Sequence, residues 1–260
     1  MTERSWVDVR TDPRGVATVT IDNAEKLNAL AGPVAAALVA AVETLGRDDR
    51  LRVIVLRGAG ERAFIGGADV RELASLNADT AASFITGIHR ACDCLRRAPV
   101  PVIARIQGYV LGAGLEVAAA CDMRVASTDS VFGMPEVRIG IPSVVEAALL
   151  PQLIGWGRTR QLLLTGDNIS AEQARDWGLI EEKVVPAELD AAVERLVASI
   201  LASGKEAVRL QKALIRDWEE LHTAAAVQRG IACFASAFAT DEPSRMIGHA
   251  LEQMQNRRKP

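Results

Sequence analysis

Short β-branched segments alternate with helical segments over most of this chain, and no other feature of the sequence restricts the fold as strongly. Residues 16–21 (VATVTI) and 52–57 (RVIVLR) have the composition of strands, and a helical pattern over 31–45 lies between them. A further strand is expected over 100–106, where Pro101 suits an edge strand or a strand start. The alternation continues to about residue 185 and predicts an α/β core.

The remainder of the chain shows helical periodicity alone. The expected helical segments are 189–201, 205–214 and 219–238. No low-complexity or linker-like stretch separates the two parts, so we expect an α/β catalytic core over 1–195 and a helical region over 196–260. The helical region carries Ile231, Phe234 and Phe238, large apolar residues that predict a contact surface between subunits.

Charge and composition exclude several classes of protein. The 260 residues carry a formal net charge of −3, whereas nucleic-acid-binding domains are usually basic. The basic residues 257–259 are expected to form a frayed polar tail. The first six residues lack the pattern of a signal peptide, and no apolar run is long enough to cross a membrane. The four cysteines show no zinc-like spacing, so we expect reduced thiols and a cytoplasmic location.

Three glycine-rich turns stand out, at 64–69 (FIGGAD), 108–114 (GYVLGAG) and 132–136 (FGMPE). The first two lead into predicted helices, and the N–H groups at a helix start have no intrahelical partner and lie at its positive end. Two such starts that face one another can bind a single developing oxyanion. One turn of this kind by itself is more often only a tight turn, because glycine is the usual turn residue.

Two glutamates accompany these turns. Glu116 lies in the apolar helical stretch 115–120, where a solvated charge is not expected. Glu136 follows Pro135 in the third turn. Taken singly, Glu116 could be a structural residue paired with Arg124, and Glu136 could be a helix cap or a surface residue. Together they predict two carboxylates that share acid–base duty, with environments that separate their pKa values.

Other catalytic arrangements fit the sequence poorly. Residues 112–114 (GAG) begin like a dinucleotide fingerprint, but Val117 stands where a third glycine or alanine is needed. The sequence has no G-K-[ST] phosphate loop and no G-x-S-x-G nucleophile elbow. His89, His222 and His249 have no partners at metal-ligand spacing, so no metal site is expected.

Five segments, in their order and spacing, resemble the crotonase (enoyl-CoA hydratase/isomerase) superfamily, and the enoyl-CoA hydratases in particular. The segments are 23–30 (NAEKLNAL), 63–73 (AFIGGADVREL), 101–122 (PVIARIQGYVLGAGLEVAAACD), 132–142 (FGMPEVRIGIP) and 164–179 (LTGDNISAEQARDWGL). The resemblance implies a crotonase-type spiral core of repeated ββα units with a C-terminal helical region. It also implies a homotrimer or a dimer of trimers.

The resemblance assigns roles to individual residues. Ala68 and Ala113 stand where backbone N–H groups form the oxyanion hole, and Glu116 and Glu136 match the two glutamates of the hydratases. Many isomerases of the superfamily keep only the second glutamate, so the presence of both favours a hydratase. The positions implied to hold the CoA substrate, mostly through backbone, are Lys26, Leu27, Ala29, Gly66, Ala68, Asp69, Val70 and Gly112.

The implied reaction of fatty acid metabolism is syn addition of water to a 2-enoyl-CoA thioester, which gives a 3-hydroxyacyl-CoA. Glu116 would take a proton from the water, and Glu136 would deliver one to the α-carbon. No metal or redox cofactor is needed, because coenzyme A enters as part of the substrate. Isomerisation, retro-aldol cleavage and thioester hydrolysis through the same enolate are alternatives. A nucleic-acid-binding relative on this scaffold is disfavoured by the acidic charge balance.

One segment departs from the superfamily pattern. After Pro142 most hydratases continue with a glycine-rich stretch, whereas residues 143–147 are SVVEA here. Bulkier side chains and a third carboxylate, that of Glu146, are therefore expected close to the acyl pocket. Glu146 itself is expected at the surface or in a salt bridge, as charged residues mostly are.

Overall fold

The computed structural model of the chain describes residues 5–256. The polar tail expected at 257–259 and the first four residues, on which part of the expectation about a signal peptide rested, lie outside the described residues. Two compact units divide the chain after Val197. Within the described range, no helix combines the length and the apolar character needed to cross a membrane.

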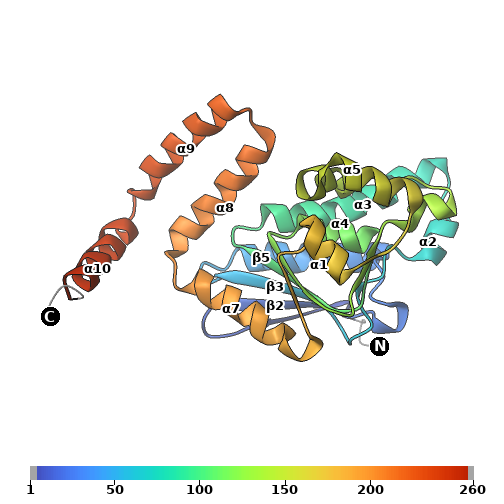
Figure 1. Cartoon of the computed structure of the whole chain (residues 1–260), viewed down its shortest axis with the longest axis horizontal. Helices are drawn as coiled ribbons and strands as arrows, with labels where there is room; N and C mark the ends of the chain where they lie inside the picture. The colour runs from blue at the N-terminus through green and yellow to red at the C-terminus, as the bar shows by residue number, and fades with distance from the viewer. Residues whose placement is uncertain (1–4, 257–260) are drawn as a thin grey trace. The chain divides into compact units, whose positions relative to one another are not determined.

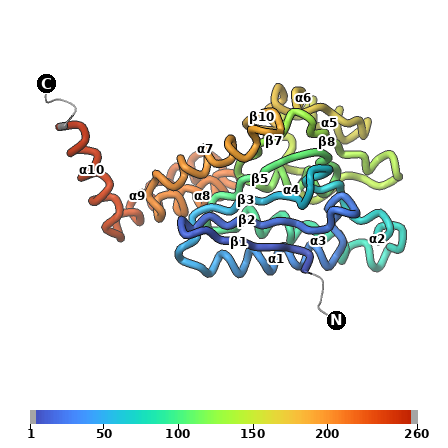
Figure 2. Tube along the Cα trace, turned by 90° about the horizontal axis from the view of Figure 1, so that it is seen from below, coloured from blue at the N-terminus to red at the C-terminus, as the bar shows by residue number. Residues whose placement is uncertain are grey.

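A six-stranded sheet runs through the first unit in the order β1-β2-β3-β5-β7-β10, which can be followed from strand to strand in Figure 2. Its strands are β1 (Val7–Thr11), β2 (Val16–Ile21), β3 (Val53–Gly58), β5 (Val102–Ile106), β7 (Met123–Ser127) and β10 (Glu182–Val184). β1 is antiparallel to β2, and the other neighbours are parallel. All five residues of β5 are buried, as is typical of parallel strands covered on both faces.

The position of β5 decides between the two alternatives for Pro101, an edge strand or a strand start, in favour of the second. It lies between β3 and β7 and is not an edge strand. Pro101 stays outside the strand and precedes its first residue, Val102, whose N–H donates to the carboxylate of Asp122 (2.6 Å). The proline therefore removes no hydrogen bond from the sheet, which makes a central position possible.

A second, four-stranded sheet has the order β4-β6-β8-β9. Its strands are β4 (Ala63–Ile65), β6 (Tyr109–Leu111), β8 (Val131–Gly133) and β9 (Ile169–Ser170). Along the chain, β3 is followed by β4, β5 by β6 and β7 by β8, and a helical segment closes each turn. Each turn thus adds one strand to each sheet, and this confirms the predicted α/β spiral of ββα units.

The helices of the first unit accompany these sheets (Figure 1). The α-helices are α1 (Gly32–Gly46), α2 (Val70–Ala74), α3 (Ala78–Arg97), α4 (Ala113–Ala120), α5 (Leu150–Thr165), α6 (Ala171–Trp177) and α7 (Leu189–Leu201), the last of which extends past the division between the units. Short 3-10 helices are η1 (Ala24–Lys26), η2 (Pro135–Ile139), η3 (Val145–Leu149) and η4 (Pro186–Glu188). Buried apolar residues of α1, α3 and α4 join those of both sheets in one core.

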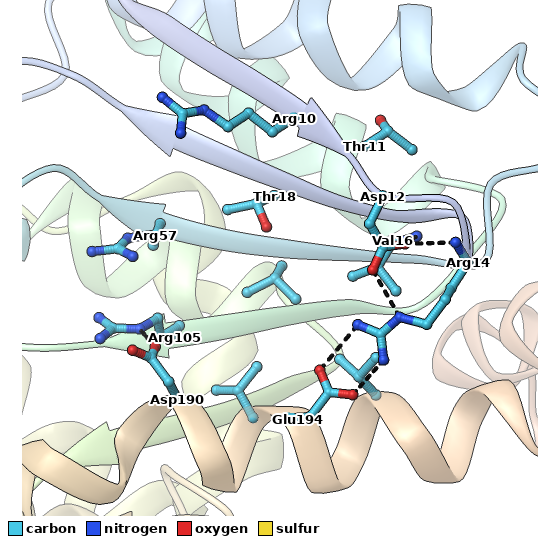
Figure 3. A pocket seen from close by; sticks show the side chains of 13 residues that line it. Arg10, Thr11, Asp12, Arg14, Val16, Thr18, Arg57, Arg105, Asp190 and Glu194 are labelled. Atoms are coloured by element: carbon cyan, nitrogen blue, oxygen red, sulfur yellow. Dashed lines mark hydrogen bonds and ion pairs between the residues drawn. The ribbon is translucent and has the colours of Figure 1, made fainter.

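Ion pairs connect the first two turns of α7 to the large sheet, beside a hollow of about 350 Å³ (Figure 3). Arg14, in the turn after β1, donates to both Asp12 (2.8 Å) and Glu194 of α7 (2.5 Å). Arg105 of β5 is buried and contacts Asp190 of α7, which lowers the pKa of that carboxyl. The Arg14–Glu194 pair is exposed, and exposed pairs contribute little stability.

The second unit is helical, as predicted, but its helices differ from those expected. They are α8 (Lys205–Glu220), α9 (Thr223–Ala237) and α10 (Glu242–Asn256). The expected helix 219–238 was wrong, because Leu221 is extended (φ −100°, ψ 143°) and separates α8 from α9. His222 then starts α9 by accepting the N–H of Ala225.

Candidate active site

The glycine-rich turns converge on one hollow of the first unit, with a volume of about 240 Å³. It lies among α2, α3, the start of α4 and the segment that contains η2. The site residues predicted from the sequence that line it are Gly66, Ala68, Val70, Gly112, Ala113, Glu116 and Glu136. The structure therefore brings together residues from three segments that are far apart in the sequence.

Close packing at the start of α4 explains the glycines around Ala113. Gly112 has φ +50° and ψ −121°, a conformation that L-residues rarely adopt. A β-carbon on Gly114 would lie 2.1 Å from the carbonyl oxygen of Ile65, so only glycine lets α4 approach β4. The start of α4 is thereby held against the short strands β4 and β6.

Two residues that line this hollow, Ala68 and Ala113, belong to different glycine-rich turns. Ala113 is the first residue of α4, so its N–H has no intrahelical acceptor. Ala68 pairs with Leu30 in a parallel bridge that uses the N–H of Asp69 and the carbonyl of Gly67. Among residues 5–256, neither the N–H of Ala68 nor that of Ala113 donates to a protein group. Two donors directed at one position can stabilise a developing oxyanion, and this role of Ala68 and Ala113 stays a prediction.

Glu116 is buried in the first turn of α4, with 4% of its surface exposed. Its Oε1 accepts the N–H of Ala147 (3.2 Å). Burial, followed by the negative charges of Glu136 and Glu146, raises its pKa from 4.5 to about 8. The alternative pairing with Arg124 is wrong, because that guanidinium binds the carbonyls of Ala118 and Cys121 and the carboxylate of Glu181.

Glu136 reaches the same hollow from η2. Its Oε2 accepts a hydrogen bond from the hydroxyl of Ser143 (2.8 Å). Its Oε1 lies so close to Gly112 that a β-carbon there would stand 2.4 Å away. The readings of Glu136 as a cap or a surface residue are not supported, because it is only partly exposed and caps no helix.

The expected CoA-binding residues that do not line this hollow lie next to residues that do. Leu27 accepts the N–H of Gly66 (2.8 Å), and the side chain of Lys26 contacts Asp69 (2.8 Å). Asp69 in turn caps α2 by accepting N–H groups of that helix. Lys26, Leu27, Ala29 and Asp69 do not line the hollow, so their contact with a CoA group stays a prediction.

A larger apolar hollow of about 620 Å³ extends from the first. Both are lined by Val70, Leu73, Phe84, Ile85, Ile139, Ile141, Pro142 and Val144. The second hollow continues along α2 and the first turns of α3, and Asn77 is the one polar residue of its described lining. This continuous apolar surface suits an acyl chain.

Ser143 and Val144 of the departing segment 143–147 line the first hollow, so the expected bulkier side chains do lie beside it. Glu146 is buried, with 4% of its surface exposed, and is not part of either hollow. It forms a pair with His89 of α3 (2.8 Å), so the salt bridge was predicted correctly but the surface position was not. Sequence reasoning missed both His89 and Ser143 as site residues. The one signal in the sequence that could have pointed to them was the replacement of the family's glycine-rich stretch by SVVEA at residues 143–147.

Comparison with known proteins agrees with this geometry. The enoyl-CoA hydratase/isomerase family model matches residues 11–260. A Bacillus subtilis protein named as an enoyl-CoA hydratase/isomerase is 33% identical, over 94% of this chain and 93% of its own. The short-chain-enoyl-CoA hydratase of Clostridium acetobutylicum is also 33% identical, over 87% of each chain.

Solved structures agree as well. An enoyl-CoA hydratase from Mycobacterium smegmatis superimposes with a TM-score of 0.93 at 29% identity, over 96% of this chain and 97% of that one. The aligned 96% includes residues of both units. The chain belongs to the enoyl-CoA hydratase/isomerase family, with the crotonase-type fold.

Proposed function

We propose that this chain is an enoyl-CoA hydratase, which adds water across the double bond of a 2-enoyl-CoA thioester and forms a 3-hydroxyacyl-CoA. The observation that carries the proposal is the meeting of two carboxylates, Glu116 and Glu136, with two free N–H donors in one apolar hollow. Hydration needs one group that accepts a proton from water and one that gives a proton to carbon.

The N–H groups of Ala68 and Ala113 would bind the thioester oxygen. As water adds to the β-carbon, negative charge moves onto this oxygen and an enolate forms. Two fixed donors stabilise the enolate more than the neutral thioester, by about 3 to 4 kcal/mol for each donor in comparable sites. The positive end of α4, behind Ala113, acts in the same direction.

The two glutamates must hold one proton between them for this reaction. In the free protein, burial and the charge of Glu136 keep that proton on Glu116, whose pKa is about 8. In the proposed division of roles, Glu116 accepts a proton from water and Glu136 gives one to the α-carbon. The proton must therefore pass to Glu136 before water attacks, and the catalytic water between the two carboxylates would carry it.

The substrate we propose has an apolar acyl group larger than crotonyl. The second hollow, about 620 Å³, would remain largely empty beside a four-carbon acyl chain. Arg138 is the one basic residue in the described lining of the two hollows, and it is held by Asp167 and the carbonyl of Thr165. No uncommitted cation of the described lining is left to bind a carboxylated acyl chain. The reaction as proposed requires no metal or redox cofactor.

A screen of enoyl-CoA esters tests the proposal. Short, branched, aromatic, long and carboxylated 2-enoyl-CoA esters are mixed with the enzyme, and loss of the conjugated thioester absorbance is followed. We expect the highest kcat/KM for long or bulky apolar esters, and 3-hydroxyacyl-CoA as the product by mass spectrometry. No loss of absorbance with any ester would contradict a hydratase, and a clear preference for crotonyl-CoA would contradict the acyl class.

Double-bond isomerisation is a second candidate, and the raised pKa of Glu116 favours it. A carboxyl group that stays protonated near neutral pH need not act as a base, and Glu136 alone could then move a proton between two carbons. The substitution Glu116→Gln separates the two reactions. A hydratase should lose nearly all activity, whereas an isomerase that relies on Glu136 should keep most of its rate.

A further inference from the structure

A buried carboxylate and a half-exposed histidine form a pair next to the candidate active site. Glu146, on η3, has a side chain that is 5% exposed, and its Oε1 lies 2.8 Å from Nδ1 of His89 on α3. An ionised carboxylate can only accept, so Nδ1 of His89 is the donor whenever Glu146 is ionised. Oε2 of Glu146 is buried, and no hydrogen-bond partner for it occurs among the described residues. Within residues 5–256, His89 is therefore the one hydrogen-bond partner of the Glu146 carboxylate.

The pair connects to Glu116 through a short stretch of backbone. Ala147, next to Glu146, donates its N–H to Oε1 of Glu116 (3.2 Å), so η3 supports this carboxylate from behind. The charge of Glu146 contributes to the raised pKa of Glu116. Since Glu146 lines neither hollow, it can act on the reaction only through Glu116 and not by contact with a substrate in these hollows.

Other ionisable groups also face Glu116 from the elements around α4. Glu136 approaches from η2, and the buried thiol of Cys92 lies on α3, one turn from His89. Burial first, and then the charges of Glu146 and Glu116, raise the pKa of this thiol, so it is neutral. β4 has no ionisable side chain, and Tyr109 of β6 is exposed. Glu146, whose partner is His89, is therefore the charged group acting on Glu116 that the proposed reaction does not use.

We propose that Glu146 and His89 are positioning residues that determine which glutamate of the active site holds the shared proton. Ionised Glu146 favours the proton on Glu116. His89 weakens this effect, because its N–H and any positive charge on its ring partly neutralise Glu146. The ring of His89 is half-exposed (48% of the side chain). A change of its charge at the protein surface thus alters the effect of Glu146 on the buried carboxylate of Glu116. The inference rests on the proposed hydration in the kinetic tests below, which measure turnover of an enoyl-CoA ester. It does not rest on it in the infrared titration.

The pH dependence of kcat/KM for the most active enoyl-CoA ester tests the inference. Loss of the shared proton sets the alkaline limb. Glu146→Gln keeps the size of the side chain and removes its charge, so this limb should move to lower pH by about one unit, the scale of a neighbouring charge. KM should stay within about twofold. Glu43→Gln, which removes an exposed carboxylate from α1, is the matched control and should leave the profile unchanged.

A double-mutant comparison tests the part played by His89. His89→Gln should shift the alkaline limb when Glu146 is present, and should have no effect on it in the Glu146→Gln background. An unmoved limb in Glu146→Gln, or an equal effect of His89→Gln in both backgrounds, would overturn the inference. A simple loss of folding stability would lower the rate at every pH and would not move the limb.

Infrared titration of the substrate-free protein separates this inference from the proposed function. The carboxyl band of protonated Glu116 is identified by its loss in Glu116→Gln, and its titration is then followed in the Glu146→Gln protein. A shift to lower pH supports the role of Glu146 even if no enoyl-CoA ester is turned over. A titration that stays in place contradicts that role, whatever the reaction.

Discussion

The carboxylate of Glu136 rests on the backbone of Gly112, because a β-carbon on this glycine would lie 2.4 Å from Oε1. Gly112→Ala should therefore displace the carboxylate and strain a backbone with positive φ. We expect kcat to fall by at least about tenfold, since small displacements of acid–base groups are costly. Gly87→Ala is the control. No atom would lie within 4 Å of the new β-carbon, and mid-helix alanine is favoured over glycine, so activity should be kept.

Glu116 and Glu136 should act as a unit. We expect each single substitution by glutamine to reduce turnover by roughly 10²- to 10⁴-fold, the range for positioned acid–base groups. The double substitution should cost little more than the worse single one, because the loss of either group already disables the pair. Steady-state kinetics of the three variants measure this. Full activity of Glu136→Gln on every ester would contradict the assignment.

The raised pKa of Glu116 should make stability depend on pH. Between pH 4.5 and about 8 the unfolded chain releases this proton while the folded chain retains it. The contribution of Glu116 to the free energy of unfolding therefore falls as pH rises through this window, by a few kcal/mol at most. Urea unfolding should show Glu116→Gln to be more stable than the unmodified protein at pH 9 and about equal at pH 4. A constant difference across this range would show that the pKa is not raised.

If the N–H of Ala113 belongs to an oxyanion hole, two substitutions at this residue should differ strongly in their effect on turnover. Ala113→Gly keeps the N–H and should have a mild effect. Ala113→Pro removes the donor, while proline is otherwise tolerated in the first turn of a helix. We expect kcat to fall by roughly 10²- to 10³-fold, the loss seen when one such donor is removed. Near-normal turnover by a folded proline variant would exclude this N–H from catalysis.

The family resemblance implies trimers or dimers of trimers, and this assembly stays a prediction that exposed apolar residues of the second unit support. Ile231, Phe234 and Phe238 of the α9 region are each more than half exposed, and the last two rings lie 5.3 Å apart. Exposed apolar groups of this kind usually mark interfaces. Light scattering at micromolar concentration should give a multiple of 27.8 kDa, and Phe234→Glu should lower it. A mass of one chain for the unmodified protein would contradict the prediction.

The sequence by itself determined the class of fold and most of the candidate site. The strand–helix alternation, the glycine-rich turns and the glutamates at 116 and 136 are local patterns, because each follows from propensity, turn chemistry or the polarity of a short stretch. Tyr109–Leu111 and Val131–Gly133 show why other strands were missed. Three residues are too few for a periodic signal, and they become strands only because successive turns of the spiral pair them.

Tertiary structure decided what surrounds the two glutamates. Glu146 has the polarity of a surface residue, and its burial depends on a histidine 57 positions earlier in the chain. The contact of Ser143 with Glu136 likewise depends on how η2 and the segment after it fold back on one another. The free energy of a buried charge is set by its partners and by the loss of water around it. Both of these arise only when distant segments pack together, so the state of Glu116 is a property of the folded chain.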